Sequence, residues 1–166
     1  MKNIKSEFEK QFSGTDSNGN KTVTTLNYTF VNSVKRKKDF FIEFTDKVKG
    51  GGKSAVGKVD EVGDTQQNRI QVSSGLNNSN TTETAIHELG HTAGLRHETD
   101  SQNPSVVKNS MGTNNTMNAS GFGNNQITAE QLTEVAKNTP TTTVIKPKDL
   151  PAMINIPRTV IKPINK

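Results

Sequence analysis

All three histidines of the 166-residue chain lie within eleven residues, at positions 87, 91 and 97. On a helix, His87 and His91 are one turn apart on the same face, so both imidazoles can bind one metal ion. Glu88 lies beside them and can reach a water molecule on that ion. Gly94 permits a sharp turn that returns His97 to the same ion. Three neutral nitrogen ligands leave a fourth position open, as in catalytic zinc sites, so we expect one catalytic Zn²⁺.

Two other interpretations of this cluster are weaker. The pattern fixes five residues: three histidines, one glutamate and one glycine. Such a spacing should arise by chance on the order of once in 10⁵ chains or fewer, so unrelated histidines do not explain it. A purely structural metal site does not explain Glu88, because this residue is not needed as a ligand.

The segment from His87 to His97 reads HELGHTAGLRH and follows the pattern H-E-x-x-H-x-x-G-x-x-H, which resembles the zinc signature of the metzincin metallopeptidases. The resemblance implies a zinc endopeptidase in which the three histidines bind the metal and Glu88 is the general base. It also implies a methionine-bearing turn beneath the metal. We expect that methionine to be Met111, with Met117 as the alternative.

The resemblance further implies an edge strand, upstream of the active-site helix, that pairs antiparallel with a protein or peptide substrate. The expected strand is formed by Ala55, Val56, Gly57, Lys58 and Val59. The sequence departs from astacin-type members of the clan, which carry a metal-binding tyrosine after the methionine. Tyr28 is the only tyrosine in this chain, so the metal, with or without a backbone donor, must stabilise the oxyanion.

Alternating apolar and polar residues predict the strands that support this site. The alternation predicts strands at 22–32 and 39–46, which we expect to be antiparallel neighbours joined by a solvated turn at Lys35–Lys38. Shorter strands are predicted at 55–59 and 68–73, with a polar turn between them.

Helical periodicity completes the expected fold. An apolar stripe predicts the active-site helix over about 81–93, ended by Gly94. A capping box at Thr128–Gln131 predicts a C-terminal helix over about 128–138, whereas residues 99–126 are too polar to pack by themselves. We therefore expect an α+β fold similar to that of the zincins: a small, twisted, mostly antiparallel sheet with an active-site helix and a C-terminal helix.

The composition divides the chain in two. Residues 139–166 contain five of the six prolines and carry +4 of the formal net charge of +5. We expect residues 1–138 to form the metallopeptidase domain and residues 139–166 to form a basic, proline-rich extended tail. The tail is either a spacer or a strand-like clamp on the body or a partner. The tail, or residues 1–20, could also occupy the cleft as a built-in inhibitor.

Several function classes are excluded by composition. The chain has no cysteine, which excludes disulfides and cysteine-ligated zinc. The body is nearly neutral, so we expect no nucleic-acid partner. No stretch approaches the ~18 apolar residues of a membrane span, and the amino terminus lacks the apolar region of a signal peptide. We expect a monomer that is secreted or delivered without a conventional signal peptide.

The sequence supports two functional hypotheses. The first is a zinc endopeptidase, with a short cysteine-free body that is similar to the peptidase domains of bacterial polymorphic toxins. Such an effector implies an inhibitor or immunity protein as a partner. The alternative is an interaction module, in which the zinc site is structural and the basic tail binds a partner. The presence of Glu88 favours the enzyme.

Overall fold

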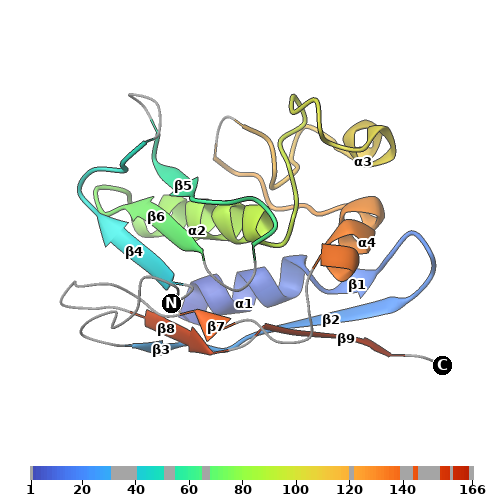
Figure 1. Ribbon diagram of the computed structural model, residues 1–166, viewed down its shortest axis with the longest axis horizontal. Helices are drawn as coiled ribbons and strands as arrows, with labels where there is room; N and C mark the ends of the chain where they lie inside the picture. Colours follow the sequence, from blue (N-terminus) through green and yellow to red (C-terminus); the bar gives the residue numbers. More distant parts are fainter. Residues whose placement is uncertain are drawn as a thin grey trace.

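The computed structural model of the chain is shown in Figure 1. It describes residues 2–28, 41–50, 55–64, 68–119 and 122–138, and the backbone alone of strand residues 29–30, 144–145, 154–157 and 159–164. The turn predicted at Lys35–Lys38 lies outside the described residues.

The described residues form helices and two sheets. The helices are α1 (Lys2–Gln11), α2 (Asn78–Thr92), α3 (Ser105–Ser110) and α4 (Ala129–Asn138). The strands are β1 (Gly14–Thr15), β2 (Lys21–Leu26), β3 (Thr29–Phe30), β4 (Phe41–Thr45), β5 (Gly57–Val59), β6 (Arg69–Ser73), β7 (Val144–Ile145), β8 (Ile154–Pro157) and β9 (Thr159–Ile164).

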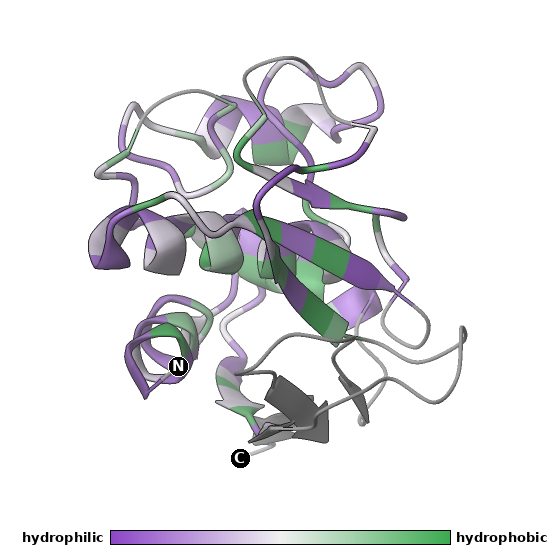
Figure 2. Cartoon of the chain, turned by 90° about the vertical axis from the view of Figure 1, so that its left-hand side faces the viewer, coloured by the Kyte–Doolittle hydropathy of each residue, from purple (hydrophilic) through white to green (hydrophobic). Residues whose placement is uncertain are grey.

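The larger sheet has the strand order β3-β8-β4-β6-β5, with β7 paired to β8, and the smaller sheet has the order β1-β2-β9. All pairs are antiparallel except β4 with β6. Apolar and polar residues alternate along strands of the larger sheet, as Figure 2 shows. The predicted α+β fold with a mostly antiparallel sheet is confirmed.

The predicted pairing of the first two long strands is wrong. Strand β4 pairs with β6 along one edge and with β8 along the other, so neither edge is left for β2. Strand β2 pairs instead with β1 and β9. Alternation along a strand predicts which side chains face the core, but it does not choose between possible partner strands.

The carboxy-terminal segment contributes backbone pairs to both sheets. Strand β9 pairs antiparallel along β2, from Lys21 opposite Ile164 to Leu26 opposite Thr159. Strand β8 lies between β3 and β4. In Figure 1 these strands run along the lower side of the molecule, beneath α1.

The core lies between the larger sheet, α2 and α1. Side chains from these elements and from the later loops form one buried cluster. Its largest fully buried members are Phe12, Leu26, Ile42, Ile70, Ile86, Leu95 and Met117. Helix α2 packs on β5 and β6 on one side and on α1 on the other, so the helix that carries the histidine motif is central to the fold.

Specific caps fix both ends of α2. Asn77 caps the start, with its Oδ1 accepting the Asn80 N–H at 2.9 Å, so the helix begins three residues before the predicted position. At the end, Gly94 has φ of +92°, and the Gly94 and Leu95 N–H groups donate to the carbonyls of His91 and Gly90, both at 3.0 Å. The predicted helix end at Gly94 is confirmed, and the chain reverses there.

The capping box of α4 is also confirmed. The Thr128 N–H donates to Gln131 Oε1 at 3.0 Å, and the Gln131 N–H donates to Thr128 Oγ1 at 3.2 Å. Helix α3 was not expected, because the segment around it is almost entirely polar. It is short, and Val107 is its buried residue.

Candidate metal centre and active-site cleft

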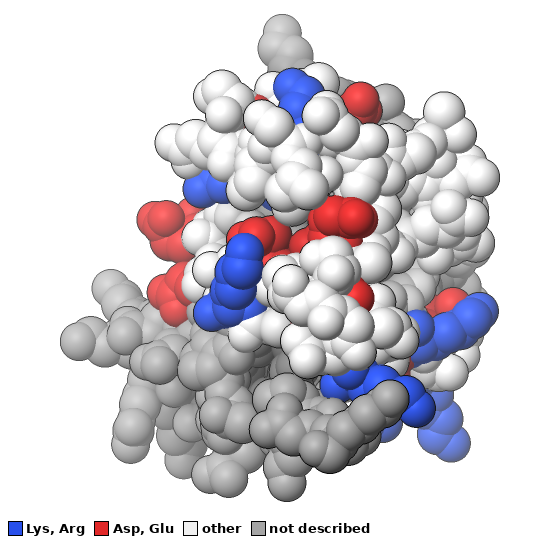
Figure 3. All heavy atoms as spheres, turned by 90° about the vertical axis from the view of Figure 1, so that its right-hand side faces the viewer, with Lys and Arg blue, Asp and Glu red and all other residues white. Residues whose placement is uncertain are grey.

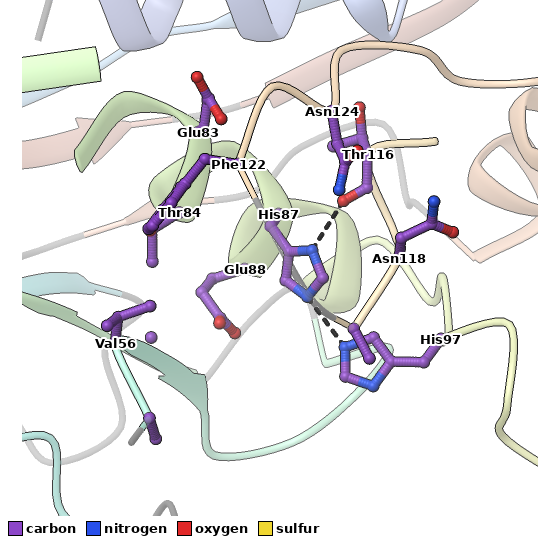
Figure 4. Close-up of a pocket in the computed structure, with 13 residues that line it drawn as sticks. Val56, Glu83, Thr84, His87, Glu88, His97, Thr116, Asn118, Phe122 and Asn124 are labelled. Atoms are coloured by element: carbon purple, nitrogen blue, oxygen red, sulfur yellow. Dashed lines mark hydrogen bonds between the residues drawn. The ribbon is translucent and has the colours of Figure 1, made fainter. Parts of the chain in front are cut away.

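Three imidazoles converge on one point. His97 Nε2 lies 2.9 Å from His87 Nε2 and 3.0 Å from His91 Nε2. His87 and His91 lie one turn apart on α2, and His97 follows the chain reversal at Gly94. Figure 4 shows His87 and His97 facing each other, with Glu88 beside them. Within the described part of the chain, these histidines form the group that could hold a metal ion.

Backbone carbonyls orient two of these rings. His87 Nδ1 lies 2.7 Å from the Thr116 carbonyl oxygen, and His91 Nδ1 lies 2.8 Å from the Leu95 carbonyl oxygen. A carbonyl oxygen only accepts, so each Nδ1 carries the proton and each neutral ring directs the lone pair of its Nε2 towards the centre.

The buried rings are neutral at neutral pH. Burial lowers the pKa of His87 to about 4 and that of His91 to about 3, and it also lowers the pKa of His97. Nitrogen lone pairs that face one another at about 3 Å repel unless they share a cation. Neutral imidazole nitrogens are ligands that zinc prefers, so this donor set fits a divalent transition-metal ion.

Glu88 lies beside the three imidazoles and is only 6% exposed. Among the described residues, no hydrogen bond holds its carboxylate. Burial raises the pKa of Glu88 to about 8. A cation at the imidazoles would favour the charged carboxylate and lower that pKa, and a charged carboxylate can accept a proton.

The site opens into a cleft of about 520 Å³. One wall is formed by residues 55–57 at the start of β5, the floor by α2, and the other wall by residues within 116–124. The predicted edge strand covered residues 55–59. In the structure, β5 comprises Gly57–Val59, and Ala55 and Val56 precede it and line the cleft. Strand β5 ends the larger sheet within the described part of the chain.

The wall opposite β5 is tied to α2. Glu83 lies one turn before His87, and its Oε2 accepts the Gly123 N–H at 2.5 Å. Its Oε1 accepts the Ser79 hydroxyl at 3.2 Å. The neighbouring Phe122 lines the cleft and is 48% exposed. Sequence reasoning missed both Glu83 and Phe122, since nothing in the polar segment around Phe122 indicates which helix it meets.

The two methionine candidates occupy different places. Met117 is fully buried and lies against α2, where a Cβ at Gly90 would be 2.5 Å from its Sδ. The turn that carries Met117 also supplies the Thr116 carbonyl that orients His87. Met111 follows α3, is partly buried, and accepts a weak bond from Asn103 Nδ2 at 3.6 Å. Thr116 was not predicted, because a backbone carbonyl has no signal in the sequence.

We expect Met117→Ala to lower the free energy of unfolding by about 2–5 kcal/mol, because it leaves a cavity beneath α2. Met111→Ala should cost less, since its side chain is only partly buried. Denaturant unfolding of both variants, with metal content measured in parallel, checks this order. A larger loss for Met111→Ala would contradict it.

The face that carries α3 and α4 has mixed charge. On the face that carries α3 and α4, Figure 3 shows Lys and Arg side chains interspersed with Asp and Glu, without a large patch of one sign among the described residues. No helix in the described residues is long and apolar enough to cross a membrane.

The comparisons with known proteins agree with this geometry. Residues 3–139 match the family model described as metallo-peptidase family M12. Neither a curated protein nor a solved structure matches the chain. The family match covers most of the chain and contains all three converging histidines, the buried Glu88 and the cleft. The chain therefore belongs to metallo-peptidase family M12.

Proposed function

We propose that the chain is a zinc-dependent endopeptidase of the metzincin type. One observation carries this proposal: three neutral imidazoles meet at the floor of an open cleft with a buried carboxylate beside them. A structural site would need neither the cleft nor Glu88. The family match supports the same reaction class, because its members are metallopeptidases.

His87, His91 and His97 would hold the zinc ion through Nε2. When bound, zinc lowers the pKa of water toward about 7 and polarises a peptide carbonyl. Glu88 accepts a proton at its carboxylate from the attacking water and then donates it to the leaving amine. Glu88 is only 6% exposed, so bulk water has little access to the proton that it carries between these two steps.

The edge of β5 is the proposed binding site for the substrate backbone. Strand β5 pairs with β6 through Gly57, Lys58 and Val59, which leaves its other edge beside the cleft. An extended peptide can add to this edge as an antiparallel strand and lie across the metal site. Peptides that are N-methylated at alternate residues should be cut much more slowly than their unmodified parents, and equal rates would exclude strand addition.

Met117 is the proposed methionine of the turn beneath the metal. It is fully buried against the helix that carries His87 and His91, and the adjacent Thr116 carbonyl orients His87. The polarisable thioether fills the space beneath the ligands without competing for the metal.

The experiment for the proposed activity is cleavage of an unfolded protein mixture. The expected result is new amino termini in the presence of the protein, loss of cleavage after chelation, and recovery when zinc is added back. Cleavage that persists in the verified absence of metal would reject the proposal.

We further propose that this peptidase is a monomeric bacterial effector, which is secreted or delivered to its target and restrained by an inhibitor or immunity protein. The absence of cysteine supports this role, because the folding of such a chain does not depend on the redox state of the compartment. Expression in a bacterial cytoplasm should slow growth for the wild type but not for Glu88→Gln. Equal growth of the two strains, at equal protein levels and with cleavage activity in the lysate, would contradict the effector role.

A further inference from the structure

We infer that Gly57 is a positioning residue for Glu88, and that the missing side chain at Gly57 sets where the proton-accepting carboxylate lies. This inference rests on the proposed peptidase function. It starts from the closest approach between β5 and α2. A Cβ at Gly57 would lie 2.5 Å from Glu88 Oε1, 2.5 Å from Thr84 Cγ2 and 3.0 Å from Glu88 Cγ.

The backbone on both sides of this contact is fixed. Gly57 is paired with Val72 in the β5–β6 ladder, and the neighbouring Val56 carbonyl accepts the Ser73 N–H at 2.8 Å. On the other side, α2 is buried against the sheet and α1. A methyl group at Gly57 therefore cannot be accommodated by separating the strand from the helix.

Of the two side chains in contact with Gly57, Glu88 is the one that would move. Thr84 is short, β-branched and 6% exposed, so its methyl group can change position only by rotation about χ1 within a buried space. Glu88 is longer, and no hydrogen bond among the described residues holds its carboxylate. Packing against Gly57 is thus the contact that confines Glu88 on the side of β5.

An alanine at Gly57 is expected to act on catalysis more strongly than on stability. Gly57 does not have a positive φ, so an alanine is compatible with the backbone. The methyl group would displace the flexible end of the Glu88 side chain, and it would also press on the Thr84 methyl group, so some loss of stability is expected as well. The same displacement takes the carboxylate away from the position where it accepts a proton, and shifts of about 1 Å can reduce rates about 100-fold.

The kinetic test compares Gly57→Ala with wild type and with Gly75→Ala. Gly75 is a matched control, because a Cβ there would meet only Ser73 Oγ, at 3.8 Å. For Gly57→Ala we expect kcat to fall about 10- to 100-fold, with KM within about twofold and zinc content unchanged. Adding Thr84→Ser removes the methyl group on the other side and should restore part of kcat. An unchanged kcat, or an equal fall in Gly75→Ala, would overturn the inference.

A second measurement needs no activity. Melting temperatures are compared for wild type, Gly57→Ala, Glu88→Ala and the double variant. If the added methyl group meets the Glu88 side chain, Gly57→Ala should lower the melting temperature more in the wild-type background than in the Glu88→Ala background, where only the contact with Thr84 remains. Additive changes would overturn the contact. If the cycle shows coupling while wild type cleaves nothing, the proposed function fails and the contact between Gly57 and Glu88 stands.

Discussion

Glu88→Gln is expected to retain the metal and to reduce peptide hydrolysis by at least about 10²- to 10⁴-fold. Glutamine has nearly the same shape as glutamate, so it fits the space beside Gly57 and leaves the histidines in place. It cannot accept a proton from the attacking water, and it cannot donate one to the leaving amine. The rate should therefore fall through kcat, while substrate affinity changes little.

Glu7→Gln is the matched control for this substitution. Glu7 lies on α1 and forms a surface ion pair with Lys10 at 3.5 Å, with 41% of its side chain exposed. The Glu7→Gln substitution removes the same charge from the chain at a site outside the cleft, so full activity is expected. A Glu88→Gln variant that is as active as wild type would eliminate Glu88 as the general base. Loss of metal from the variant would instead indicate that Glu88 supports the metal site.

The second large effect is expected from metal removal. His97 reaches the other two ligands only after the chain reverses at Gly94, so a bound ion joins α2 to the following loop. Binding to the folded state at 100 times Kd stabilises by about 2.7 kcal/mol. For a domain of this size that corresponds to a fall of roughly 5–11 °C in melting temperature on removal of the metal. Differential scanning calorimetry before and after chelation measures this fall in melting temperature.

The matched variant for this prediction is His91→Ala. His91 is buried, and its Nδ1 donates to the Leu95 carbonyl, so the variant removes both a ligand and that bond. Its melting temperature should be low and insensitive to chelator. Returning zinc to chelated wild type should restore the original value. An unchanged melting temperature in wild type, with elemental analysis confirming that the metal has gone, would refute the coupling of metal binding to folding.

The convergence of the three histidines could be predicted because their arrangement is local. His87 and His91 are four residues apart, so their side chains lie on the same face of any helix. The backbone freedom of Gly94 allows the chain to turn and bring His97 back to them. Capping chemistry is similarly local, which explains why the Thr128–Gln131 box was predictable. These features depend on a few neighbouring residues and a regular backbone.

Features that depend on distant contacts could not be predicted. The sequence does not show that β8 and β6 occupy both edges of β4. It also does not show that Met117 lies under α2, because the polar segment that carries both methionines has no periodicity that indicates burial. The Thr116 carbonyl and the close approach of Gly57 to Glu88 are properties of the backbone, and they become visible only in three dimensions.

The most direct test of the central claim is the metal content of wild type and His91→Ala, measured by elemental analysis after equilibration with zinc and removal of the free ion. We expect one zinc ion per wild-type chain and a large loss from the variant, because three converging imidazoles form the proposed site. Wild-type protein that retains no metal, or a variant that retains as much as wild type, would contradict it.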